Sequence, residues 1–108
     1  MVLPSKELLS ALGYEESTYQ EIVQIASIED NTFPSLNDLA NEIKIWAFSK
    51  NYSIFSSIEK SAEYKMVGVA KLAKFGVRGI RHFYADTESE VVFLAGEAIL
   101  KQLNKENN

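Results

Sequence analysis

The stretch from residue 51 to residue 85 constrains the fold more than any other part of this sequence, because it separates two clearly helical patterns and is rich in strand-forming residues. Its runs "NYSIFSSIEK", "YKMVGVAKL" and "VRGIRHFYAD" carry the tyrosines, isoleucines, phenylalanines and valines that favour strands. We therefore expect three strands, over residues 52–58, 64–72 and 77–85, with "AKFG" as a hairpin turn.

The same stretch also fits a helix over residues 58–75, with Gly76 as a helix-ending residue. Apolar residues recur there three or four positions apart: Ile58, Ala62, Met66, Val69 and Ala73. The glycines, the β-branched residues and the cluster of rings favour the strands. The sequence thus predicts an α+β protein, with an all-α helical bundle as the alternative.

Two flanking segments have strong helix-start signals. Ser35 precedes an apolar stripe and has an acid three residues later, so we expect a helix over residues 35–49. Thr87 and Glu90 form a second capping box, which predicts a helix over residues 87–104.

The N-terminal third is predicted to be helical as well. "PSKELLSALG" is typical of a short helix that ends at Gly13, and Ser17 and Thr18 have capping spacing for a second helix. The breaker cluster "EDNTFP" follows at residues 29–34. We expect a single domain over residues 1–108, with an N-terminal helical extension at 1–33, an α-β-β-β-α core at 34–104 and a frayed tail at 105–108.

The core resembles the double-stranded-RNA-binding domain in the order of its elements. "PSLNDLANEIK" looks like that family's first-helix opening, Tyr52 stands where the family often begins its first strand, and "AGEAILKQL" is similar to its last helix. Glu42 of the first helix is kept, but acidic residues in "EKSAEY" and "TESEV" replace the family's phosphate-binding residues. Over residues 34–104 the resemblance therefore implies this fold, with a surface that repels RNA and serves as a protein-protein module.

Positive charge is concentrated in one part of an acidic chain. Residues 60–82 hold six Lys or Arg against one acid, whereas the rest of the chain holds five against fourteen, and the net charge is −4. Such asymmetry indicates either a contact surface or a solvated face that pairs with the protein's own carboxylates. The candidate residues for an acidic partner or, as the alternative, a nucleic acid are Lys71, Lys74, Arg78, Arg81 and His82.

Chemistry-bearing patterns are few. There is no cysteine, His82 is the one histidine, and no phosphate-binding loop is present, so we expect no catalytic residues, no metal site and no cofactor. The apolar runs are too short to span a bilayer, and we expect a cytoplasmic protein with no membrane partner.

The final helix carries apolar residues on two sides. Beside its main stripe lie Phe93, Gly96 and Leu100, and Phe48 of the earlier helix likewise points away from its own stripe. Either the N-terminal helices cover this second side or another chain does. We predict a small non-enzymatic interaction or adaptor module that associates with a protein partner or with itself, through Phe48, Phe93, Gly96 and Leu100.

Overall fold

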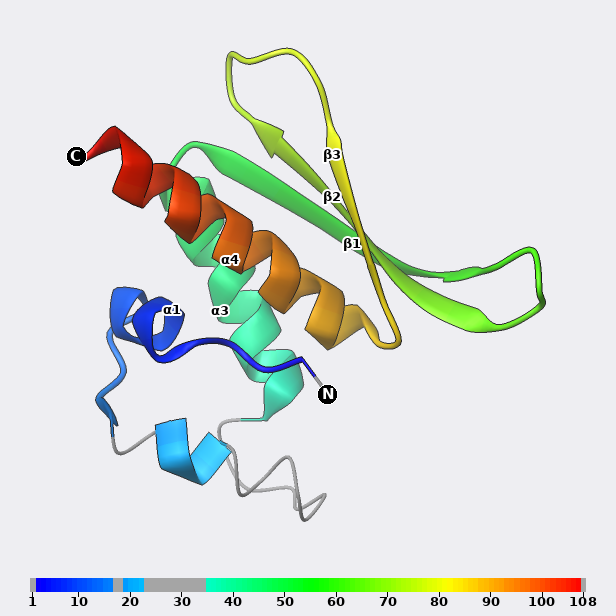
Figure 1. Cartoon of the computed structure of the whole chain (residues 1–108), viewed down its shortest axis with the longest axis horizontal. Coiled ribbons are helices and arrows are strands. Elements are labelled where there is room, and N and C mark those ends of the chain that lie inside the picture. Colours follow the sequence, from blue (N-terminus) through cyan, green and yellow to red (C-terminus); the bar gives the residue numbers. More distant parts are fainter. Residues whose placement is uncertain (1, 17–18, 23–34, 108) are drawn as a thin grey trace.

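The computed structural model describes residues 2–16, 19–22 and 35–107 and confirms the α+β class (Figure 1). Residues 66–74 form a strand, which rules out the all-α alternative. The elements are α1 (Lys6–Ala11), α3 (Leu36–Ser49), β1 (Tyr52–Lys60), β2 (Met66–Lys74), β3 (Arg81–Ala85) and α4 (Glu88–Glu106). No helix within the described ranges is long and apolar enough to cross a membrane.

The helix starts follow the capping signals of the sequence. Ser35 and Asp38 form the reciprocal capping box at the start of α3, and the Thr87 hydroxyl accepts a hydrogen bond from the Glu90 amide at 3.1 Å at the start of α4. Helix α1 ends before Gly13, whose φ of +99° suits a residue without a Cβ atom. The second predicted N-terminal helix and the breaker at 29–34 lie largely outside the described residues, although residues 19–22 are helical.

The three strands form an antiparallel meander in the order β1-β2-β3. The observed strands differ from the predicted ranges mainly at β3, which begins at Arg81 instead of residue 77. Gly76 and Gly79 both have positive φ, so the connection at 75–80 cannot continue an extended strand. Likewise, Tyr64 has a φ of +62° in the β1–β2 turn, which delays the start of β2 to Met66.

One face of the sheet packs on α3 and α4, and these two helices lie between the sheet and α1 (Figure 1). Gly68 of β2 permits the close approach of α4, because a Cβ atom there would lie 2.3 Å from the Thr87 carbonyl oxygen. The core combines side chains of all three layers: Leu8, Leu9, Leu39, Ile43, Ala47, Tyr52, Ile54, Ala70, Leu72, Val91, Val92, Phe93, Ala95 and Ile99.

The other face of the sheet has no covering element among the described residues. The strand register places Phe55, Lys71 and His82 in one row across it, and all three are exposed. Tyr84 lies in the next row beside Val69. Val69 is only 3% exposed, so the neighbouring side chains of this open face pack over it.

Candidate functional site

The apolar patch predicted on the final helix is mostly interior, and the prediction is wrong for two of its residues. Phe93 is fully buried in the core. At Gly96 a Cβ atom would lie 2.8 Å from Ile43 Cγ2 and 3.1 Å from Leu8 Cδ2, so α1 and α3 close over this position. The N-terminal helix therefore covers the second apolar side of α4, and neither residue is available to a partner.

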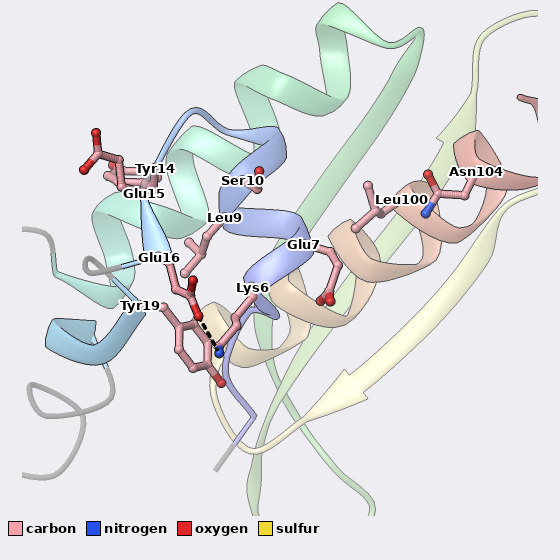
Figure 2. A pocket seen from close by; sticks show the side chains of 10 residues that line it. All are labelled: Lys6, Glu7, Leu9, Ser10, Tyr14, Glu15, Glu16, Tyr19, Leu100 and Asn104. Atoms are coloured by element: carbon pink, nitrogen blue, oxygen red, sulfur yellow. Dashed lines mark hydrogen bonds and ion pairs between the residues drawn. The ribbon is translucent and has the colours of Figure 1, made fainter.

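Leu100 is partly buried against the same core and lines a hollow of about 730 Å³ between α1, the segment that follows it and α4 (Figure 2). Lys6 spans part of this hollow: its Nζ lies 3.1 Å from Glu16 Oε1 and 5.6 Å from the centre of the Tyr19 ring. Leu100 thus contributes to the packing between α1 and α4 within the chain.

Phe48, the fourth residue of the predicted patch, is 79% exposed at the C-terminal end of α3. It lines a groove of about 470 Å³ together with Phe75, which is 88% exposed, and with Ser53 and Ala73 of the open face. The Phe75 amide donates a hydrogen bond to the Asn51 carbonyl at 2.8 Å, which ties the two loops of this end together. We call this the Phe48–Phe75 groove.

Phe75 was not identified as a site residue from the sequence, because this phenylalanine lies beside a turn glycine and belongs to no regular repeat of apolar residues. The open face extends the groove, since Ser53 pairs with Ala73 and Phe55 follows two residues later on the same side of β1. Phe55 is 73% exposed. Three exposed phenylalanines therefore lie at one end of the sheet and along its open face.

The predicted basic residues divide between the two faces of the sheet. Lys71 and His82 are cross-strand neighbours on the open face. Lys74, Arg78 and Arg81 instead line a pocket of about 510 Å³ on the helix-facing side, against the C-terminal half of α4. Lys71 and Lys74 point to opposite faces because they lie three residues apart in one strand.

Lys74 is held at the rim of this pocket by α4. Its Nζ donates a hydrogen bond to Glu106 Oε1 at 2.9 Å, and the same oxygen accepts from Gln102 Nε2 at 3.4 Å. The hydrogen bond with Glu106 raises the pKa of Lys74, and the same bond lowers the pKa of Glu106. Lys74 also lies 5.6 Å from the ring centre of Tyr52, whose buried hydroxyl has no hydrogen-bond partner among the described residues.

Comparison of the chain with family models, with curated proteins and with solved structures finds no match. Inference about function therefore rests on these surfaces.

Carboxylates do not gather into a metal site in the part of the chain that the structure describes, where no three His, Cys, Asp or Glu side chains lie close enough to hold an ion. Glu90 is engaged elsewhere: it accepts hydrogen bonds from the Val2 amide at 2.9 Å and from the Thr87 hydroxyl at 2.9 Å. What the described surface offers is an aromatic groove, an open sheet face and a basic pocket.

Proposed function

We propose that this domain is a non-enzymatic module for protein-protein association, and that it binds a second copy of itself through the Phe48–Phe75 groove and the adjoining open face. The observation that carries the proposal is the exposure of Phe48, Phe55 and Phe75 along one continuous surface. Large apolar side chains gathered in this way mark contact surfaces more often than scattered exposed residues do.

Charge favours a second copy as the occupant. Among the described residues the one charged side chain that lines the groove is Lys74, and Glu106 of the same chain neutralises it. A two-fold contact brings the same patch of both subunits together, so it requires a surface without uncompensated like charges. The groove meets this requirement, so we expect the two-fold axis to pass through it. Lys71 of the open face is exposed and has no ion pair among the described residues, and it would then lie away from its own copy. The basic pocket on the other side of the sheet would repel its own copy.

The observed order α3-β1-β2-β3-α4 supports the further proposal that the core is related in fold to the double-stranded-RNA-binding domain and has been turned to protein binding. The acidic first turn of α4, with Glu88 and Glu90, fits that change of role. A cytoplasmic location belongs to the same proposal, since a sequence without cysteine suits a reducing compartment.

Self-association is tested by sedimentation equilibrium across the micromolar range. The wild-type protein is expected to show an average mass above the 12.1 kDa of one chain. Changing Phe48→Ser together with Phe75→Ser should return the mass to that of a monomer with little change in the melting temperature, because both side chains are exposed.

The matched control changes two exposed apolar residues at the opposite end of the sheet, Ile58→Ser and Met66→Ser. This variant should keep the wild-type mass distribution. A wild-type protein that stays monomeric, or a control variant that dissociates as fully as the Phe48 and Phe75 variant, would contradict the proposal.

The open face favours a second candidate, the binding of single-stranded nucleic acid. Phe55 and Tyr84 offer rings on which bases stack, and Lys71 and His82 lie beside them with donors for phosphate. This candidate ranks second because Lys74, Arg78 and Arg81 lie on the opposite side of the sheet.

A further inference from the structure

We propose that the pocket between the C-terminal half of α4 and the β2–β3 connection binds an acidic segment of a partner polypeptide, with a partner carboxylate held by Arg78, Arg81 and Lys74. This inference goes beyond self-association and uses a surface of opposite character. The pocket shares Tyr52 and Lys74 with the Phe48–Phe75 groove, but its remaining lining comes from Leu72 of β2, the 75–80 connection, β3 and α4.

Three basic residues line the pocket, from β2, the connection and β3, and no acidic residue among the described residues lines it with them. Of the three, Lys74 has a carboxylate partner, Glu106 at the rim. Within the described ranges neither Arg78 nor Arg81 has a carboxylate within 4.0 Å. Arg78 and Arg81 are both exposed. Like charges that line one pocket repel each other, so a bound anion would stabilise this arrangement.

The guanidinium of Arg81 is held in place by an aromatic ring. It lies 5.0 Å from the ring centre of Phe83, which is on the same side of β3 two residues later. A guanidinium that is already positioned over a ring loses less rotational freedom on binding than a freely rotating arginine does. It can still bind a carboxylate with two parallel hydrogen bonds. Arg81 is therefore the residue we expect to contribute most to binding.

A carboxylate already occupies the rim of this pocket. Lys74 donates to Glu106 of the same chain, and Gln102 donates to the same oxygen. Glu106 is on the last turn of α4, where helix ends fray readily, so a partner carboxylate can take its place.

The walls indicate a polypeptide instead of a nucleic acid. Leu72, Val77, Ile80 and Ala98 give the pocket an apolar lining between its cations, which matches acidic residues alternating with aliphatic ones. A phosphate backbone, in contrast, would extend over the rest of the surface. Outside residues 60–82 the chain holds fourteen Asp or Glu against five Lys or Arg, and these would repel it.

The probe is a fluorescently labelled synthetic peptide of alternating Glu and Leu residues, and its binding to the full-length protein is followed by fluorescence anisotropy at low salt. Arg78→Gln and Arg81→Gln should each weaken binding about tenfold, as expected for the loss of a charged hydrogen bond. Glu106→Gln should strengthen binding several-fold, because it removes the internal competitor for Lys74. The same peptide with Gln in place of Glu should not bind.

The matched control is Lys60→Gln with Lys101→Gln, which removes two charges outside the pocket and should leave the affinity unchanged. A control variant as weak as the Arg78 and Arg81 double variant would overturn the proposal, since nonspecific attraction would then account for the binding. Equal affinity for a single-stranded oligonucleotide of the same charge would overturn the choice of a polypeptide.

The two proposals fail separately. The Phe48→Ser and Phe75→Ser variant keeps Arg78 and Arg81, so it should bind the acidic peptide with wild-type affinity even as a monomer. Loss of peptide binding in that variant would contradict a separate acidic-segment pocket, whereas a monomeric wild type that still binds the peptide would contradict self-association alone.

Discussion

Tyr14 links the segment after α1 to α3, because its hydroxyl donates a hydrogen bond to the Glu42 carboxylate. Burial, followed by this hydrogen bond and the negative charge of Glu42, raises the pKa of Tyr14 from 10.0 to about 12. Glu42 thereby holds the N-terminal segment against α3.

This contact predicts a loss of stability at high pH. The folded state favours the protonated phenol, so between pH 10 and about 12 it binds a proton that the unfolded chain has released. The stabilisation is complete below pH 10 and is lost as pH rises through the folded-state pKa. Urea unfolding from pH 9 to 12 should show a steeper fall in the free energy of unfolding for the wild type than for Tyr14→Phe; parallel curves would contradict it.

At the scale of elements, the distance between α4 and its two neighbours depends on two glycines with different surroundings. Gly68 faces backbone atoms at the start of α4, and the Thr87 carbonyl oxygen lies 2.3 Å from the position of an added Cβ. Gly96 faces side chains and not backbone: Leu8 Cδ2 ends a flexible side chain, whereas Ile43 Cγ2 is attached to Cβ and moves only by a shift of the helix or a change of χ1. The helix–sheet contact is therefore less able to adjust than the helix–helix contact.

Gly68→Ala should consequently cost about 3 kcal/mol of stability, at the upper end of the range for overpacked cores. Gly96→Ala should cost roughly 1 kcal/mol or less, because alanine also favours the helix by about 1 kcal/mol. Thermal unfolding followed by circular dichroism compares the two variants under one set of conditions. A Gly96→Ala variant that melts below Gly68→Ala would show that α1 and α3 are packed more rigidly than the sheet.

At the scale of the whole molecule, the basic segment forms two separate surfaces and not a stripe along one face. Lys71 and His82 lie on the open face of the sheet, and Lys74, Arg78 and Arg81 line the pocket on its helix-facing side. A backbone of phosphates cannot contact both groups at once without crossing an edge of the sheet. The remaining surface is acidic and weakens such binding further.

We therefore expect no measurable binding to duplex or single-stranded nucleic acid at about 150 mM salt, where screening acts beyond about 8 Å. The measurement is fluorescence anisotropy over stepped salt concentrations, in which three or four phosphate contacts would give a slope of log K against log salt of roughly −3. Micromolar binding at that salt, lost in Phe55→Ala with Tyr84→Ala, would instead establish the open face as a nucleic-acid surface.

The sequence by itself determined the starts of the principal helices and favoured the α+β class over the all-α alternative. Capping boxes at Ser35 and Thr87 act over a few residues of chain, so their effect can be predicted without knowing the tertiary structure. It determined less between residues 58 and 75, where strand and helix patterns both fit. The segment forms strands because one of its faces packs against α3 and α4. Residues with positive φ set the positions at which these strands begin and end.

Only the tertiary structure decided which residues reach the surface. The helical periodicity of the sequence places Phe93 and Gly96 on a second apolar side of α4 but does not say what covers it. They are interior because α1, more than eighty residues away in the chain, packs there. That Lys71 and Lys74 point to opposite faces follows from the alternation of side chains along a strand. Which of these faces lies toward the helices was decided by the packing of α3 and α4 on one side of the sheet. The burial of Phe93 and Gly96 and the choice of the covered face both arise from contacts between distant parts of the chain, which local patterns in a sequence do not encode.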